Sequence, residues 1–257
     1  MPTRTVLILQ HVEVEKPGLI LDALDGSGLD VEVRNLIDLP DASAADLPPV
    51  SDLAGLVVMG GPMNADDLAA HPALKLERDL LAEALRCGTP TLGVCLGAQL
   101  LARAQDLAVR SGAELGRESE IGWSPLREVD RDDPVVGPLA DAPAVLHWHG
   151  DRIVPGADTR VLARTDTTEC QAFRIGQAAW GLQLHLEVTP ALLDDWLAEP
   201  SFAAEATDAL GPQAMDKLKA DARAAAPALR PLAERSLTHL RGLFEARANG
   251  WRTRSGP

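Results

Sequence analysis

A cysteine between two glycines lies at the junction of an apolar run and an Ala/Leu-rich run, in the stretch GVCLGAQ at residues 93–99. Residues 89–95 are typical of a short buried strand, and residues 97–109 are typical of a helix. A sharp strand-to-helix turn presents its turn residue at the carboxyl edge of a sheet, and flanking glycines permit the required backbone angles. The dipole of the following helix favours a thiolate and lowers the pKa of the cysteine. Cys95 is therefore a candidate nucleophile, the alternative being a small buried residue at a tight turn.

A histidine and a glutamate two residues apart lie in the stretch GLQLHLEVT at residues 181–189. On a strand-like run, side chains at this spacing point to the same face. A carboxylate beside an imidazole fixes its tautomer and stabilises the imidazolium that forms when a thiol is deprotonated. His185 and Glu187 are thus the candidate base and its orienting partner for Cys95.

Two glycines end an earlier apolar run, in the stretch MGGPM at residues 59–63. If that run is a parallel strand, Gly60 and Gly61 lie at the same sheet edge as Cys95. Their N–H groups, with the N–H of Leu96, can then stabilise a developing oxyanion. The alternative is an ordinary turn at the end of a strand.

The elements that must position these residues follow from hydrophobic periodicity. In the first half of the chain, strand and helix signals alternate, with strands expected at 5–10, 30–36, 53–61 and 89–95 and helices at 17–27, around 76–87 and at 97–109. Such alternation predicts an α/β fold whose mostly parallel central sheet is flanked by helices on both faces. Leu76, Leu80, Ala84 and Cys87 have helical spacing, which makes Cys87 a core residue.

The second half of the chain changes character. Short strand-like segments are expected at 113–117, 124–129, 144–150, 159–165, 170–176 and 179–188. Helix dominates from residue 189 onward. We therefore expect a catalytic domain over residues 1–190 and a helical C-terminal extension over residues 191–257 that packs on the same domain.

Composition excludes several functional classes. The chain has 257 residues and a formal net charge of −14, with no long basic cluster, which argues against binding to nucleic acid or an anionic membrane. No apolar stretch approaches the length of a membrane span, and no signal peptide is recognisable. The three cysteines are widely spaced, which predicts neither a disulfide framework nor a cysteine-rich zinc site. We expect a cytoplasmic protein.

The stretches GVCLGAQLLA, MGGPM, EIGW and HGD…GLQLHLEVT together resemble the class I glutamine amidotransferase family with a Cys-His-Glu triad, and within it the stand-alone GMP-synthase-like domains. The similarity covers residues from about 5 to 190. It implies a flavodoxin-like three-layer fold, with Cys95 as nucleophile, His185 as base and Glu187 as its partner. It also implies an oxyanion site at Gly60, Gly61 and Leu96.

The resemblance further implies a substrate site. Gln99 would help to hold the substrate, and the stretch HWHGD would contact its α-amino acid end through Trp148, His149 and Asp151. The chain departs from the family at two positions. Leu186 replaces the proline of the usual His-Pro-Glu sequence, and Trp148 replaces a common serine. The first change keeps the spacing of the triad, whereas the second bears on substrate preference because an indole narrows a pocket or stacks on a larger substrate.

The reaction implied is hydrolysis of the γ-carboxamide of glutamine, or of another γ-glutamyl amide or peptide, through a γ-glutamyl thioester on Cys95, without a cofactor. The partner is glutamine or a γ-glutamyl small molecule, with or without a separate ammonia-accepting synthetase. A stand-alone γ-glutamyl hydrolase is the first alternative. A catalytically silent partner-binding or redox-responsive protein is the second. The third is a metallohydrolase, because His147, His149 and Asp151 have H-x-H-x-D spacing. His11, His71 and His239 are expected to be surface or packing residues.

Overall fold

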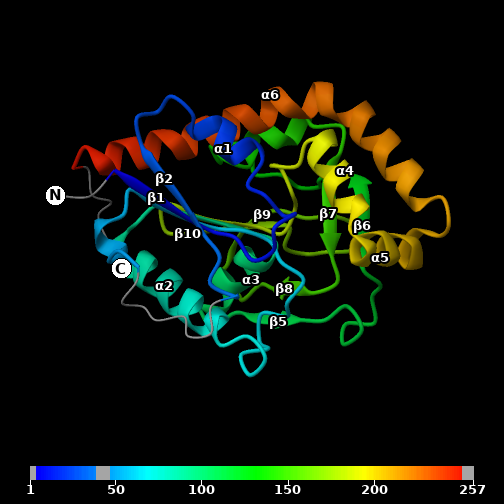
Figure 1. Cartoon of the computed structure of the whole chain (residues 1–257), viewed down its shortest axis with the longest axis horizontal. Coiled ribbons are helices and arrows are strands. Elements are labelled where there is room, and N and C mark those ends of the chain that lie inside the picture. The colour runs from blue at the N-terminus through cyan, green and yellow to red at the C-terminus, as the bar shows by residue number, and fades with distance from the viewer. Residues whose placement is uncertain (1–3, 39–46, 251–257) are drawn as a thin grey trace.

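The computed structural model describes residues 4–38 and 47–250. These residues form three layers, in which a seven-stranded sheet lies between two layers of helices (Figure 1). The strand order is β2-β1-β3-β4-β11-β10-β9. All strand pairs from β2 to β11 are parallel, and β10 is antiparallel to both of its neighbours. In chain order the strands are β1 (Thr5–Leu9), β2 (Asp30–Arg34), β3 (Gly55–Val58), β4 (Thr91–Val94), β9 (Arg160–Ala163), β10 (Ala172–Ile175) and β11 (Ala179–Leu182).

Helices cover both faces of this sheet. One face packs against α1 (Leu19–Leu24) and the long α6 (Ala214–Ala248), which runs along the top of the view in Figure 1. The other face packs against α2 (Ala73–Cys87) and α3 (Leu96–Arg103). Because successive side chains of a strand point to opposite faces, β1 and β3 contribute to both apolar cores. The expected α/β fold with a mostly parallel, helix-flanked sheet is confirmed.

Smaller elements surround the central sheet. Two-stranded sheets pair β5 (Ala108–Arg110) with β8 (Arg152–Val154), and β6 (Glu120–Ser124) with β7 (Val145–His149). Two short helices follow the last strand, α4 (Pro190–Ala198) and α5 (Pro200–Leu210), and two 3₁₀ turns lie at Val50–Asp52 and Gly137–Asp141. A third apolar core joins α4, α5 and the first half of α6 to β6 and β7.

Several segment predictions were wrong. The helix expected over 97–109 ends at Arg103, since Asp106 takes a left-handed turn (φ 58°) before β5 begins. The strand expected at 113–117 is a turn, because the side chain of Glu114 accepts hydrogen bonds from the backbone and hydroxyl of Ser111. Residues 124–129 contribute only the end of β6 and an isolated bridge from Arg127 to Arg164.

The strand expected over 179–188 ends at Leu182. Beyond it, Gln183 N–H donates to Gln171 O, and His185 N–H donates to Leu146 O. The chain therefore leaves the sheet just before the predicted base.

The second half of α6 shares an apolar core with the central sheet, whereas α4 and α5 pack on β6 and β7. The boundary near residue 190 stays a prediction. No helix in the described part of the chain is long and apolar enough to cross a membrane.

Candidate active site

Cys95 lies in a sharp turn between β4 and α3, with a strained backbone for a residue that has a side chain (φ 49°, ψ −107°). The glycines on either side permit close chain contacts: a Cβ at Gly93 would press into the backbone of Gly97, and a Cβ at Gly97 would overlap the carbonyl oxygen of Val58. The turn therefore places the cysteine at the carboxyl edge of the sheet and at the start of a helix, as the sequence predicts.

The structure brings Cys95, His185 and Glu187 together in a buried group. His185 Nδ1 lies 2.7 Å from Glu187 Oε1, and both side chains are about 1% exposed. Because Nδ1 faces the carboxylate, Nε2 is the ring nitrogen left to interact with the thiol of Cys95, and the two groups act on each other's pKa. The rings of Trp196 and His185 are nearly perpendicular, with their centroids 5.0 Å apart, so Trp196 packs against the imidazole. Although β11 ends early, the two-residue spacing still gives the geometry of a triad.

The protonation of this group is set by burial and by Glu187. Burial raises the pKa of the Cys95 thiol, and the hydrogen bond and charge of His185 oppose that rise. Burial lowers the pKa of His185, but the charge of Glu187 and the hydrogen bonds to Cys95 and Glu187 raise it well above its usual value overall. Burial therefore acts against the lowering of the thiol pKa that is expected from the helix dipole. Thiolate formation depends on the imidazolium of His185.

Two backbone N–H groups beside the thiol have no hydrogen-bond acceptor among the described residues, those of Gly61 and Leu96. Leu96 is the first residue of α3, where helix N–H groups lack partners within the helix. Gly61 lines the same cavity as Cys95, and Gly60 lies against the ring of His185. This pair of donors is suited to an oxyanion.

An ion pair that the sequence did not indicate lies beneath the glycine turn. His11 is buried, and its Nδ1 donates to Gly60 O at 2.8 Å while its Nε2 donates to Glu77 Oε2 at 2.8 Å. Gly60 O and the Gly61 N–H belong to one peptide unit, so the ring orients that N–H. His11 was expected at the surface or in packing and instead supports the candidate oxyanion site. No local pattern identifies a pair that is 66 residues apart.

The remaining predicted binding residues lie around one cavity of about 380 Å³ next to Cys95. Gln99 is buried and donates to Gln183 Oε1 at 3.2 Å. Asp151 is held by Asn64, whose side-chain amide donates to it at 2.7 Å. The carbonyl of Trp148 lies 3.6 Å from Cys95 Sγ.

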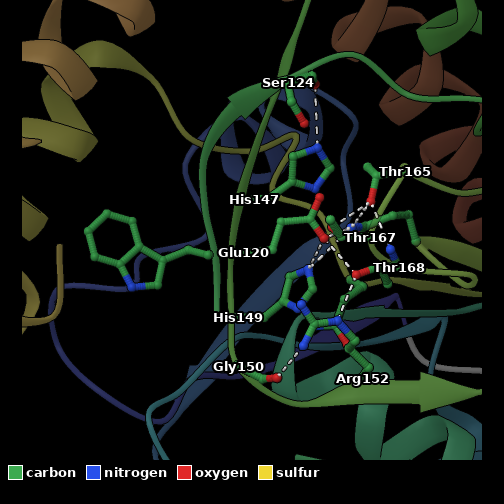
Figure 2. A network of polar contacts seen from close by, with 12 residues as sticks. Glu120, Ser124, His147, His149, Gly150, Arg152, Thr165, Thr167 and Thr168 are labelled. Atoms are coloured by element: carbon green, nitrogen blue, oxygen red, sulfur yellow. Dashed lines mark hydrogen bonds and ion pairs between the residues drawn. The ribbon is translucent and has the colours of Figure 1, made fainter. Parts of the chain in front are cut away.

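The histidines of HWHGD take part in a polar network (Figure 2). His149 Nδ1 donates to Asp151 O at 3.1 Å, and its Nε2 accepts from Gln171 Nε2 at 3.2 Å. Burial lowers the pKa of His149 to about 3, so the ring is neutral. Its ring nitrogens thus have partners within the protein.

Glu120, from the EIGW stretch, is the centre of that network. Its Oε2 accepts from Thr168 at 2.6 Å and from Gln171 at 3.0 Å, and Arg152 Nε donates to Thr168 at 3.0 Å. The network fixes β7 against β6 from one face. Trp148, which alternates with the two histidines along β7, therefore points to the opposite face and lines the cavity.

The described residues contain no group of three or more His, Cys, Asp or Glu side chains arranged to hold a metal ion. The H-x-H-x-D stretch serves the polar network instead, because Asp151 follows the strand and His147 Nε2 donates to Ser124 O at 3.4 Å. The metallohydrolase alternative has no support in this geometry.

Comparison with known proteins gives the family. Residues 18–203 match the model of the family "Glutamine amidotransferase class-I". The chain belongs to this family. A glutamine amidotransferase-like protein of Salmonella typhimurium is 31% identical over 56% of this chain and 61% of its own length, so the match spans less than two thirds of that relative. A glutamine-hydrolysing GMP synthase subunit of Haloarcula marismortui is 32% identical over 65% of this chain and 77% of its own.

Solved structures agree with the family. A glutamine amidotransferase from Thermotoga maritima superimposes with a TM-score of 0.77 at 26% identity, covering 92% of this chain and 97% of that one. The expected class I glutamine amidotransferase fold is confirmed, including the helices beyond residue 190.

Proposed function

We propose that this class I glutamine amidotransferase hydrolyses the γ-carboxamide of glutamine or of a related γ-glutamyl amide through a thioester on Cys95. The observation that carries the proposal is the buried Cys95–His185–Glu187 group beside the unpartnered N–H groups of Gly61 and Leu96. The relative from Haloarcula marismortui, which is named as glutamine-hydrolysing, supports the choice of substrate class.

The chemistry has two stages, formation of a thioester on Cys95 and hydrolysis of that thioester. The proton of Cys95 passes to His185, and the thiolate attacks the amide carbon while the oxyanion accepts hydrogen bonds from the two N–H groups. His185 then gives its proton to the departing nitrogen, the C–N bond breaks, and a γ-glutamyl thioester remains. Water, deprotonated by His185, hydrolyses the thioester to glutamate and restores the thiol. Glu187 holds Nδ1 throughout and stabilises the imidazolium.

The fate of the released amine separates two forms of the proposal. In one, ammonia passes to a separate synthetase, in keeping with the relative that is named as one component of a GMP synthase. In the other, the chain works alone as a γ-glutamyl hydrolase. The aromatic side chains of Trp148, Trp196 and Phe202 around the cavity favour the second, because they can contact a leaving group larger than ammonia. A free thiol nucleophile fits a reducing compartment, so we propose a cytoplasmic location.

The test is Cys95→Ala and Cys95→Ser in the purified protein. We expect amidase turnover with glutamine and γ-glutamyl amides to fall by at least about a thousandfold. Quenching the wild type during turnover should give a protein carrying a γ-glutamyl mass on the peptide that contains Cys95. Full activity of Cys95→Ala would refute the mechanism. A wild type that turns over none of these substrates and resists alkylation at Cys95 would support the catalytically silent alternative.

A further inference from the structure

The cavity beside Cys95 has an acidic lining. Among its described lining residues are Glu15, Asp151 and Glu205, and none is lysine or arginine. Glutamine itself carries one ammonium and one carboxylate at its α-carbon. The excess of carboxylates therefore favours a substrate with a further positive charge.

Glu15 lies beside the triad, and burial raises its pKa to about 7 against the opposing charges of His185 and His11. It lies on the loop between β1 and α1, is 5% exposed, and has no hydrogen-bond or ion-pair partner among the described residues. A Cβ placed on Gly60 would overlap Glu15 Oε2 and lie 3.4 Å from His185 Cε1, so the two side chains converge on one point. A buried carboxylate without a partner is costly unless a proton or a cation compensates it.

The loop that carries Glu15 is fixed to the wall of the cavity. Trp196 Nε1 donates to Val14 O at 2.9 Å, and Lys16 forms an ion pair with Asp195 at 3.1 Å. The position of Glu15 is therefore set by α4 and not by a free loop.

Glu205 on α5 lies at the same end of the cavity. Its Oε2 accepts from Trp148 Nε1 at 2.9 Å, and Trp148, Trp196 and Phe202 pack together with ring centroids 5.5 to 5.8 Å apart. Glu205 and Glu15 are close enough to repel each other. Carboxylates beside aromatic rings are the usual surroundings of a bound ammonium group.

Asp151 belongs to the other end of the cavity. Its charge is influenced by Glu114 and Asp66, and it is hydrogen-bonded to Asn64. Since His185 donates the proton to the departing nitrogen, the amine portion of the substrate must lie next to His185. Glu15 is the carboxylate on that side.

We propose that Glu15 and Glu205 bind a positively charged group on the departing amine, so that the preferred substrates are γ-glutamyl amides of diamines or polyamines. The inference rests on the function proposed above. The amide C–N bond breaks, the nitrogen takes its proton from His185, and the amine leaves with its second ammonium group still bound. Water supplies the hydroxyl group that completes glutamate. A leaving group with a free carboxylate, as in a γ-glutamyl dipeptide, is disfavoured by the same two side chains.

The experiment uses three γ-glutamyl amides of equal chain length, made from 1,4-diaminobutane, butylamine and 4-aminobutyrate. Their far ends are positive, neutral and negative. We expect kcat/KM to be highest for the diamine, by at least about tenfold over the neutral amide, as one charge-assisted hydrogen bond would give. The diamine-to-butylamine ratio of kcat/KM should fall toward one in Glu15→Gln and in Glu205→Gln. Glu13→Gln is the control, because it removes one negative charge at an exposed position of the same loop, and it should keep the wild-type ratio.

Three results would overturn the inference. The first is a wild type that hydrolyses the neutral or negative amide as well as the diamine amide, which would leave the proposed function intact. The second is a Glu15→Gln variant that slows all three amides equally, because Glu15 would then bind the α-ammonium group that they share. The third is absence of turnover with all three amides and with glutamine, which would overturn the proposed function as well. Thermal unfolding of each variant checks that it is folded. If Glu15→Gln does not fold, Glu205→Gln still tests the inference, because Glu205 is exposed and its substitution should not prevent folding.

Discussion

Single side chains determine the protonation of the triad, and Glu187 has the largest favourable effect on His185. Its charge and hydrogen bond raise the pKa of His185, which lets the imidazolium stabilise the Cys95 thiolate. In Glu187→Gln the pKa of His185 should fall, so the imidazole is neutral at working pH. Without an imidazolium beside it, the Cys95 thiol should ionise only at higher pH. We expect turnover to fall by about a thousandfold or more and the midpoint of Cys95 alkylation against pH to move upward. Peptide mass spectrometry of iodoacetamide labelling measures that midpoint. An unchanged or lower midpoint would contradict the role of Glu187.

The grouping of the three residues of the proposed triad could be predicted from the sequence, because each lies in a short pattern with its own geometric meaning. Cys95 lies between glycines at a strand-to-helix junction, and His185 and Glu187 are two residues apart. Glu15 and His11 have no such pattern. Their environment is created by chain segments distant in sequence, Gly60 and α4, so only the fold shows that they are buried beside the site.

At the scale of elements, the ion pair between His11 and Glu77 joins the loop after β1 to α2 and orients the Gly60–Gly61 peptide. Burial lowers the pKa of His11, but the charge and hydrogen bond of Glu77 raise it above its usual value overall. The ion pair therefore stabilises the folded state fully at pH values below the pKa of His11 in the unfolded chain, about 6.5. This stabilisation is lost as the pH rises through the higher pKa of His11 in the folded protein.

Glu77→Gln tests this connection. We expect the free energy of unfolding to fall by about 1–3 kcal/mol at pH 6, with a smaller deficit at higher pH, as urea titrations would show. We also expect kcat to fall more than KM changes, because the candidate oxyanion donor is less well oriented. Glu83→Gln, on the same helix and outside the cavity, is the control. A deficit that grows with pH would contradict a charged His11.

Element prediction succeeded where local periodicity matches tertiary packing. The buried strands β1, β3 and β4 are apolar runs between turn residues, and α2 has an apolar stripe that packs on the sheet. It failed where partners outside the segment decide the structure. Residues 183–188 have the composition of a strand, yet their backbone pairs with Leu146 and Gln171 outside the central sheet.

At the scale of the whole molecule, α6 joins the cavity wall to the far end of the central sheet. Its first half packs with α4 and α5, and its second half lies on the sheet, where the ring of Phe244 fills the space above Gly55. Gly55 begins β3, whereas Cys95 lies at the carboxyl edge of the sheet, so stability and catalysis should separate along this helix.

Phe244→Ala should show that separation. The side chain is 2% exposed, and its removal leaves a cavity against a glycine whose backbone cannot fill it. We expect a loss of about 3–5 kcal/mol in the free energy of unfolding, with kcat/KM close to the wild-type value at temperatures where the variant is folded. Met215→Ala, at an exposed position in the first turn of the same helix, should change the free energy of unfolding by less than about 0.5 kcal/mol. A large fall in the kcat/KM of folded Phe244→Ala would mean that the sheet transmits the change from the start of β3 to the turn at Cys95, and that the two ends of α6 are not independent.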